Sequence, residues 1–359
     1  MSKQRVGILG ATGMVGQRFV TLLQDHPWFT VTALAASRRS AGRTYGEAVA
    51  DRWVMQTPLA AATAALPLRD VEEVAAVAAQ VDFVFCAISL DKETTRNLED
   101  RYARAEVPVV SANSAHRWTP DVPMLIPEVN AEHLAAIPGQ RRRLGTRRGF
   151  VVTKPNCSIQ SYVPALTPLR DFGPTQVSVC TFQAISGAGK TFAAWPEMVD
   201  NVIPYISGEE DKSVREPLKV WGCVDGEGII PAEGPVISAQ CIRVPVTDGH
   251  LAAVGVRFRQ RPQREEVLSR WAAYGGRPQE LDLPSAPRPF LRYCEEDDRP
   301  QTRLDRDFEG GMGVTIGRLR PDVLFDYLFV ALSHNTLRGA AGGAVLTAEL
   351  LQAEGYLHG

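Results

Sequence analysis

The fold is decided by the segment Arg5-Val-Gly-Ile-Leu-Gly-Ala-Thr-Gly-Met-Val-Gly16, near the start of the sequence. Its apolar run 5–9 predicts a buried strand, and the spacing of apolar residues over 17–23 predicts a helix directly after the glycines. A strand, a glycine turn and a helix form the unit in which small residues let a pyrophosphate approach the backbone at a helix N-terminus. A tight turn without a ligand is the alternative. The predicted dinucleotide ligands in this turn are Gly10, Thr12, Gly13, Met14, Val15 and Gly16.

The segment after the next predicted strand, 29–36, indicates which dinucleotide binds. In this type of domain an acidic residue at that place bonds the ribose hydroxyls and repels a 2′-phosphate. Here the sequence is Ser37-Arg-Arg-Ser40, with two guanidinium groups and two hydroxyls that suit a phosphate. NADP is therefore predicted in preference to NAD, bound by Ser37, Arg38, Arg39 and Ser40. A solvated surface loop is the alternative.

Helix and strand patterns alternate over the first 155 residues and then change. Helices are predicted at 71–78 and 92–105, and strands at 81–88 and 107–111, with Ser89 facing the cofactor where a strand ends. The loop after 107–111 offers Asn113, Ser114 and Arg117 as anion ligands. The predicted class is α/β: a Rossmann-type domain over 1–155, an α+β domain over 156–332, and a segment 333–359 whose helix returns to the first domain.

A cysteine stands at a strand-to-helix turn in Thr153-Lys-Pro-Asn-Cys-Ser-Ile-Gln160. The strand is predicted at 149–152 and the helix at 158–169. Unpaired N–H groups at a helix start favour a thiolate, which is the nucleophilic form. Cys157 is therefore a candidate nucleophile, and an inert buried cysteine is the alternative. The ammonium group of Lys154 either lowers the pKa of this thiol or meets solvent.

The second part of the chain has longer predicted strands. A strand over 175–185 runs into the glycine-rich loop 186–190, and a charged helix is predicted over 208–216. The strands 236–246 and 249–258 are separated by a turn at 247–249, which predicts a hairpin that carries Arg243 and His250. A final helix is predicted over 344–352.

Composition limits the function classes. The 359 residues are 45% hydrophobic and 22% charged with a net charge of −2, so neither nucleic acid nor a membrane surface is implied. The segment 140–149 holds five arginines without aromatic residues, and we predict a solvated loop there rather than a nucleic-acid site. The six cysteines have no paired spacing, so the sequence predicts no metal site and no disulfide. A cytoplasmic location is expected.

Five short motifs lie along the chain. They are the 10–16 turn, Lys154-Pro-Asn-Cys-Ser158, Thr181-Phe-Gln-Ala-Ile-Ser-Gly187, Cys241-Ile-Arg-Val-Pro-Val-Thr-Asp-Gly-His250 and Asn335-Thr-Leu-Arg-Gly-Ala-Ala-Gly-Gly343. As an ordered set covering nearly the full length, they resemble the aspartate-β-semialdehyde dehydrogenases, and their archaeal and fungal branch in particular. The resemblance implies a fold like that of glyceraldehyde-3-phosphate dehydrogenase. It also implies the NADPH-dependent reductive dephosphorylation of β-aspartyl phosphate to aspartate β-semialdehyde, on the route to lysine, threonine and methionine.

The resemblance also implies a role for each matching residue. Cys157 would form a thioacyl intermediate that accepts hydride, His250 would be the acid/base, and Gln183 would orient the nucleophile or substrate. Arg243 would clamp the substrate carboxylate. A homodimer or homotetramer is implied as well, with 156–332 as the catalytic and dimerisation domain. Further ligands are implied for the phosphate (Arg117 with Asn113), for the substrate (Glu209 or Glu210, with Lys212) and for the cofactor (Ser186, Gly187 and Asn335).

Two other functions are compatible with parts of this pattern. A related acyl-reducing enzyme that acts on malonyl-CoA or N-acetylglutamyl phosphate would keep Cys157, His250 and the NADP site but differ in its substrate clamp. A non-catalytic NADP-binding redox sensor is the remote alternative. A single fast-reacting thiol at Cys157 fits the enzymes and not a sensor that lacks a nucleophile.

Overall fold

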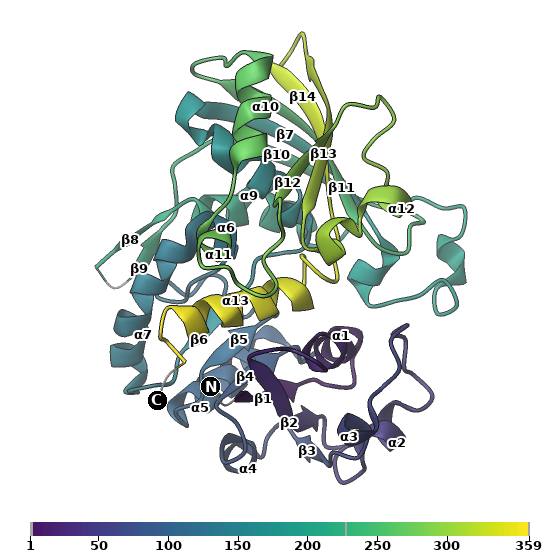
Figure 1. Ribbon diagram of the computed structural model, residues 1–359, viewed down its shortest axis with the longest axis vertical. Helices are drawn as coiled ribbons and strands as arrows, with labels where there is room; N and C mark the ends of the chain where they lie inside the picture. Colours follow the sequence, from purple (N-terminus) through teal and green to yellow (C-terminus); the bar gives the residue numbers. More distant parts are fainter. Residues whose placement is uncertain (1–2, 227, 358–359) are drawn as a thin grey trace.

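The first domain is built on a six-stranded sheet in which every strand is parallel to its neighbours (Figure 1). The computed structural model describes residues 3–226 and 228–357. The strand order is the one of a Rossmann fold, which confirms the predicted fold class. In spatial order the strands are β3 (Leu68–Asp70), β2 (Phe29–Ala36), β1 (Gln4–Leu9), β4 (Phe83–Cys86), β5 (Val109–Ser111) and β6 (Val151–Thr153).

Both faces of this sheet are buried, as a parallel sheet requires. On one face, Ile8 and Phe85 pack in the same core as Phe19 of α1 (Met14–Leu23) and Val345 of α13 (Ala341–Ala353). On the other face, the core contains residues of α4 (Val74–Ala78) and α5 (Lys92–Arg104). The remaining helices of this domain are α2 (Tyr45–Val49), α3 (Ala61–Ala64), α6 (Pro127–Asn130) and α7 (Ile137–Leu144).

The second domain is a mixed six-stranded sheet with helices on one face. Its strands, in spatial order, are β10 (Val236–Arg243), β7 (Pro174–Gln183), β11 (His250–Phe258), β14 (Tyr327–Ser333), β13 (Val314–Pro321) and β12 (Leu291–Cys294). The core on the covered face includes residues of α8 (Tyr162–Leu166), α9 (Glu209–Val220) and α10 (Arg264–Ala273). Shorter elements are β8 (Cys223–Asp225), β9 (Gly228–Ile230), α11 (Arg277–Glu280) and α12 (Thr302–Asp305).

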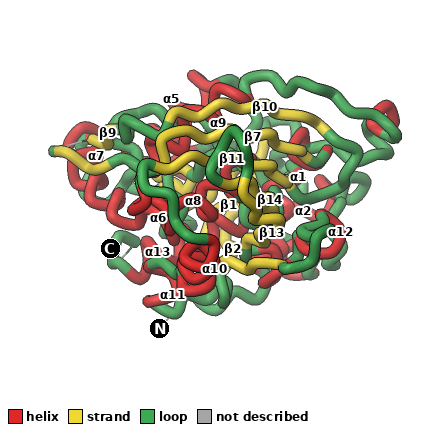
Figure 2. The backbone as a smooth tube through the Cα atoms, turned by 90° about the horizontal axis from the view of Figure 1, so that it is seen from above, coloured by secondary structure: helices red, strands yellow, loops and turns green. Residues whose placement is uncertain are grey.

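The predicted hairpin between residues 236 and 258 is wrong. The strand β7 lies between β10 and β11 (Figure 2). It pairs in parallel with β10 and antiparallel with β11. The pairing is set by a strand more than fifty residues earlier, which no local pattern reveals. The carboxyl ends of β7 and β10 meet the start of β11, so Gln183, Arg243 and His250 still converge at one edge of the sheet.

The arginine-rich segment also differs from the prediction. Arg141 and Arg143 belong to α7 rather than to a loop. The guanidinium of Arg141 stacks on the ring of Phe150, and Arg143 forms an ion pair with Asp121. Arg148 donates to the carbonyl oxygen of Asp82, 2.8 Å away. These side chains hold the segment 141–148 against the rest of the first domain.

The predicted helix over 158–169 is broken into shorter pieces. A 3₁₀ turn at Ser158–Gln160 precedes α8, and a second 3₁₀ turn spans Thr167–Phe172. Pro164 and Pro168 lie in this stretch, and a proline removes a helical N–H donor.

The helix α13 runs between the two domains (Figure 1). It is buried over Ala341–Leu351 and packs against α1 and β5 of the first domain. Small residues allow this approach, since a Cβ added at Gly342 would lie 2.6 Å from the sulfur of Met312. Among the helices in the described ranges, none is both long enough and apolar enough to span a bilayer.

Candidate active site

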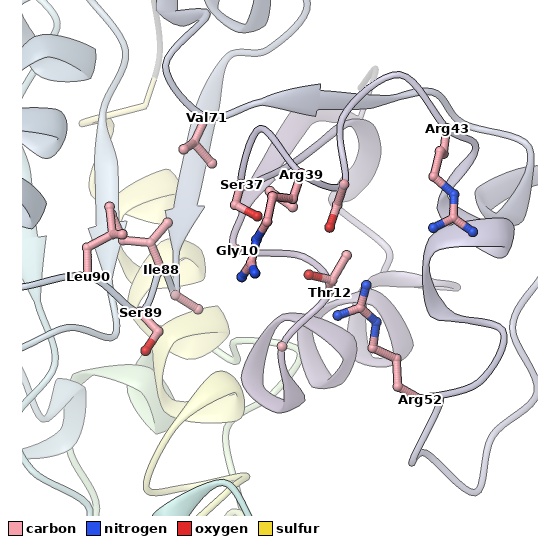
Figure 3. Close-up of a pocket in the computed structure, with 14 residues that line it drawn as sticks. Gly10, Thr12, Ser37, Arg39, Arg43, Arg52, Val71, Ile88, Ser89 and Leu90 are labelled. Carbon is pink, nitrogen blue, oxygen red and sulfur yellow. The ribbon is translucent and has the colours of Figure 1, made fainter.

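A pocket of about 590 Å³ opens at the carboxyl ends of β1, β2 and β4, where the strand order of the sheet reverses (Figure 3). Such a switch point is where open α/β sheets bind ligands. Seven of the predicted cofactor residues line it: Gly10, Thr12, Gly13, Ser37, Arg39, Ser40 and Ser89.

The glycine turn leaves room for the backbone to approach a ligand. Gly10 has a φ of +85°, and a Cβ there would lie 2.4 Å from the carbonyl oxygen of Ala87. A Cβ at Gly16 would lie 2.2 Å from the carbonyl oxygen of Gly10, so this glycine lets α1 pack on the turn. No side chain caps α1 at Gly13, and its first N–H groups are free to meet an anion. Met14, Val15 and Gly16 form the first turn of α1 and are not among the pocket-lining residues.

Three arginines line this pocket: Arg39, Arg43 and Arg52 (Figure 3). Arg43 and Arg52 are anchored by single hydrogen bonds to the carbonyl oxygens of Glu47 and Ala48, at 2.7 and 2.8 Å. Among the described residues, no hydrogen-bond acceptor is assigned to the other guanidinium N–H groups of these two arginines, which could therefore bind a ligand. No acidic side chain belongs to the described lining of the pocket, so the donor set fits the phosphates of NADP.

The described pocket lining includes only part of the predicted 2′-phosphate set. Arg38 is exposed and does not line the pocket, whereas its neighbour Arg39 does. Arg43 and Arg52 were missed because they come from the chain around α2, several residues beyond the strand end that the fingerprint marks. Arg43 could have been predicted because it lies only three residues after Ser40 in the sequence. No feature of the sequence around Arg52 indicates that it lines the pocket.

Cys157 follows β6 and begins the short 3₁₀ turn before α8. Its sulfur lies 3.4 Å from Nε2 of His250, the first residue of β11. Burial raises the pKa of the thiol to about 11, and the charge of Glu209 adds to this, while Lys154, Arg117 and Arg243 act in the opposite direction. Burial thus acts against the thiolate that the helix start was predicted to favour. The turn is only three residues long, and burial outweighs the cations.

Lys154 is buried rather than solvated. Its ammonium nitrogen donates to the carbonyl oxygens of Pro155, at 2.8 Å, and Gly339. Burial lowers its pKa to about 7, although the Cys157 thiolate would raise it. The solvent-facing alternative is thus wrong, and the lysine ties the nucleophile-bearing turn to the segment before α13.

His250 is fully buried and is held by the backbone of Ala184. The N–H of Ala184 donates to Nδ1 of His250 at 3.1 Å, and the carbonyl oxygen of Ala184 accepts from Nη1 of Arg243 at 2.7 Å. The backbone N–H and carbonyl group of one residue after β7 therefore position both side chains. Burial, and then the charge of Arg243, lowers the pKa of His250 to about 3.

A carboxylate at the start of α9 collects hydrogen bonds from three directions. Glu209 accepts from Asn156 at 3.0 Å, from Gln183 at 3.1 Å and from Lys212 at 2.7 Å. Burial would raise the pKa of this carboxyl, but the charge and hydrogen bond of Lys212 hold it below its usual value. Glu210, in contrast, accepts from the N–H of Cys241 at 3.3 Å. Of the two glutamates, Glu209 is the one beside Cys157.

Gln183 contacts Glu209 rather than the nucleophile. Its amide nitrogen donates to Glu209, and its amide oxygen accepts from the hydroxyl of Thr181 at 3.1 Å. Gln183 is also buried, with 1% exposure. The structure therefore gives it the position of a residue that orients Glu209.

The two predicted phosphate ligands, Arg117 and Asn113, differ in how many of their N–H groups already donate to protein acceptors. Arg117 is buried, donates to Glu216 at 2.8 Å and to the carbonyl oxygen of Lys154 at 3.0 Å, and keeps further donors. The amide nitrogen of Asn113 donates to Glu99 at 3.1 Å and to the sulfur of Cys86 at 3.3 Å. Both amide hydrogens of Asn113 have acceptors within the protein, and its role as a donor to phosphate stays a prediction.

Ser186, Gly187 and Asn335 lie on the catalytic side and not in the described lining of the cofactor pocket. The amide of Asn335 donates to the hydroxyl of Ser186 at 2.8 Å and accepts the N–H of Gly249 at 2.8 Å. A Cβ at Gly187 would lie 3.0 to 3.1 Å from atoms of Arg243 and His250. These three residues brace the turn that leads into His250.

The chain matches two family models that together cover most of its length. Residues 5–137 match "Semialdehyde dehydrogenase, NAD binding domain", and residues 166–338 match "Semialdehyde dehydrogenase, dimerisation domain". Aspartate-semialdehyde dehydrogenases of Aspergillus fumigatus and Archaeoglobus fulgidus are 43% and 44% identical to it. These alignments cover 99% of both chains for the first relative, and 96% of this chain and 97% of the relative for the second.

A solved structure shows the same fold. The aspartate semialdehyde dehydrogenase of Candida albicans with NADP is similar with a TM-score of 0.88 and 37% identity, over 99% of this chain and 100% of that one. The fungal and archaeal relatives confirm the branch that the motifs indicated. Because two semialdehyde dehydrogenase models match in order along the chain, and relatives are more than 40% identical over nearly the whole length, the chain belongs to the aspartate-semialdehyde dehydrogenase family.

Proposed function

We propose that this chain catalyses the NADPH-dependent reductive dephosphorylation of β-aspartyl phosphate to aspartate β-semialdehyde, the step that serves lysine, threonine and methionine synthesis. The observation that carries the proposal is the Cys157–His250 pair, 3.4 Å apart, with the buried guanidinium of Arg243 beside it. Family membership supports the same reaction.

The residues of the pocket would hold NADP at two places, its pyrophosphate and its 2′-phosphate. The 10–13 turn and the start of α1 would take the pyrophosphate, and Arg39, Arg43 and Arg52 would surround the 2′-phosphate. When bound, NADPH supplies the hydride that reduces the acyl carbon.

Cys157 is proposed as the nucleophile toward the acyl phosphate. The sulfur would form a bond to the acyl carbon while the bond from that carbon to the phosphate oxygen breaks, leaving a thioacyl enzyme. Arg243 would hold the substrate carboxylate, since it is buried and bonded by one nitrogen to Ala184. Arg117 would attract the phosphate, and the Glu209–Lys212 pair would meet the substrate ammonium and carboxylate groups.

The direct test is a turnover assay with the purified protein. Aspartate semialdehyde, NADP and inorganic phosphate should give reduced cofactor, measured by its absorbance, and omission of phosphate should remove most of the rate. Malonate semialdehyde with CoA and N-acetylglutamate semialdehyde with phosphate are the comparison substrates. Faster turnover of either one than of aspartate semialdehyde would contradict the proposed substrate.

Recognition of the 2′-phosphate is testable with neighbouring arginines. Arg39→Ala should weaken NADPH binding about 10- to 100-fold, because a hydrogen bond to a charged group contributes about 1.5–3 kcal/mol. NADH binding should change little. Arg38→Ala is the matched control, since Arg38 lies next in the chain and outside the pocket, and it should change either affinity less than threefold. Equal losses of NADPH and NADH affinity in Arg39→Ala, measured by calorimetry, would refute the assignment.

A dimer formed by the second domain is also part of the proposal. The uncovered face of its sheet carries half-buried apolar residues, among them Ala253, Leu328 and Val330, around a depression of about 290 Å³. An apolar face of this kind suits a second copy of the chain, and the matching dimerisation-domain model supports it. A tetramer and a cytoplasmic location stay predictions.

A further inference from the structure

We propose that Glu216 of α9 is a positioning residue for phosphate recognition: its buried carboxylate fixes the guanidinium of Arg117 relative to the turn that carries Cys157. The inference deepens the proposed function and rests on Arg117 being the phosphate ligand. In this role Glu216 touches neither substrate nor cofactor and acts only through Arg117.

Each oxygen of the Glu216 carboxylate accepts a hydrogen bond from a different segment of the chain. Oε1 accepts from Nη1 of Arg117 at 2.8 Å, and Oε2 accepts from the backbone N–H of Asn156 at 2.6 Å. Arg117 lies in the loop after β5 and Asn156 in the turn after β6, and these two strands are parallel neighbours. Glu216 is 0% exposed, so water does not compete for either bond. One side chain therefore sets the position of the guanidinium relative to the turn that bears the nucleophile.

Two contacts orient the guanidinium of Arg117 and leave one nitrogen for a ligand. Nη1 is bonded to Glu216, and Nε donates to the carbonyl oxygen of Lys154 at 3.0 Å. Among the described residues, no acceptor is assigned to Nη2. The charge of Arg117 acts to lower the pKa of the Cys157 thiol, so the two groups are neighbours. Because a guanidinium is a rigid planar fork, fixing two of its nitrogens also fixes the direction of the third.

The backbone around Arg117 is held independently of Glu216. The ammonium group of Lys219, three residues further along α9, donates to three carbonyl oxygens of the loop. These are the oxygens of Arg117, Thr119 and Val122, at 2.7, 2.9 and 3.0 Å. A change confined to Glu216 is therefore expected to release the guanidinium while the loop stays in place.

The turn that carries Cys157 also has supports of its own. The side chain of Asn156 donates to Glu209 at 3.0 Å and accepts from the N–H of Ser158 at 2.7 Å. Neither bond involves Glu216. The nucleophile is therefore expected to keep its place when the bond from the Asn156 N–H to Glu216 is weakened.

A positioning role and a purely electrostatic role predict opposite effects on phosphate. A carboxylate that only reduced the positive charge of the site would repel phosphate, so its removal would tighten phosphate binding. A carboxylate that positions the guanidinium would weaken phosphate binding when it is lost. Glu216→Gln separates the two roles, because it keeps the size of the side chain, removes the charge and sets an amide N–H against Arg117 or Asn156, which are both donors.

The test is the phosphate dependence of Glu216→Gln in the turnover assay. KM for phosphate should rise about 10- to 100-fold, the value of a hydrogen bond to a charged group, while KM for aspartate semialdehyde and for NADP should change less than about threefold. In the direction of this assay, reduced cofactor appears when the thioacyl enzyme forms. A phosphate oxygen then bonds to the acyl carbon, and the carbon–sulfur bond breaks with its electron pair on sulfur. The burst of reduced cofactor without phosphate should therefore stay within about threefold of the parent.

Two further variants are the controls. Asp211→Asn makes the same carboxylate-to-amide change at an exposed residue of α9, and it should leave all three KM values unchanged. Arg117→Ala removes the proposed ligand and should itself raise KM for phosphate. Adding Glu216→Gln to Arg117→Ala should raise that KM by less than about twofold further, because a residue that acts through Arg117 has no effect once Arg117 is gone.

Three results would overturn the inference while leaving the proposed function intact. They are an unchanged or lower KM for phosphate in Glu216→Gln, an equal rise in all three KM values, and an undiminished effect of Glu216→Gln in the Arg117→Ala background. A parent protein without phosphate-dependent turnover would instead contradict the proposed function. Protection of Cys157 from iodoacetamide by inorganic phosphate then tests the inference without turnover: the half-protecting concentration should be about 10- to 100-fold higher in Glu216→Gln, and an unchanged value would overturn it.

Discussion

Replacing Cys157 by serine is expected to lower turnover by a factor on the order of 10⁴ to 10⁶, as for the loss of other covalent nucleophiles. A hydroxyl is far less acidic than a thiol, and the burial that raises the pKa of Cys157 to about 11 would act on the serine as well. The change exchanges sulfur for oxygen and should leave the fold intact. NADPH affinity should be unchanged, because Cys157 is not among the described residues of the cofactor pocket.

The control is Cys223→Ser, at an exposed cysteine of β8 outside the described pocket lining. This variant should keep the parent rate. The measurement is the phosphate-dependent reduction of NADP. It is made both at steady state and in a single turnover, where the first burst of reduced cofactor reports formation of the acyl enzyme. Near-parent activity in Cys157→Ser, from a protein shown to bind NADPH, would rule out the thioacyl mechanism.

Replacing Arg338 by methionine is expected to destabilise the protein by about 3–5 kcal/mol, the range for breaking a buried ion pair from one side. Arg338 is 0% exposed and forms two hydrogen bonds with Glu128, at 2.8 and 2.6 Å. It also donates to the carbonyl oxygen of Met312 and lies over the ring of Phe290. The methionine would leave the carboxylate of Glu128 buried without its partner.

A second variant separates the unpaired charge from lost packing. The double variant Glu128→Met with Arg338→Met removes both charges and should recover most of the loss, because apolar replacements of buried pairs are often nearly neutral. Asp171→Asn, which breaks an exposed pair with Arg270, should change the free energy of unfolding by less than about 1 kcal/mol. Denaturant unfolding followed by tryptophan fluorescence measures all three. A loss as large in the double variant as in the single one would refute the charge-based explanation.

Local sequence patterns predicted most of the first sheet, but not its edge strand β3 or the helix α7. Its strands follow one another as parallel neighbours with helices between them, so periodicity and the glycine turn define both the elements and the edge where ligands bind. The second sheet was harder, because β7 is inserted between β10 and β11, and long-range pairing leaves no local trace. Even so, the motif order brought Cys157, His250 and Arg243 together correctly.

The side chains of the site show a similar limit. Sequence could not separate Glu209 from Glu210, since their difference is the direction in which each leaves the first turn of α9. Asn113 was predicted from its place after a strand, but Glu99, 14 residues earlier on α5, holds its amide. The sequence also could not show that Ala184 positions His250 and Arg243. It does so through its backbone N–H and carbonyl groups, which every residue type except proline has.

The position of α13 has a consequence for how the protein is made. Val345 and its neighbours cover the face of the first sheet that carries Ile8 and Phe85, yet they are translated after the whole second domain. A ribosome-bound chain that has completed β6 has α1 on this face but lacks α13, so part of the apolar face stays uncovered for as long as the following 190 or so residues take to emerge. At about 5–20 residues per second this lasts on the order of tens of seconds, during which chaperone binding would protect the nascent domain from aggregation.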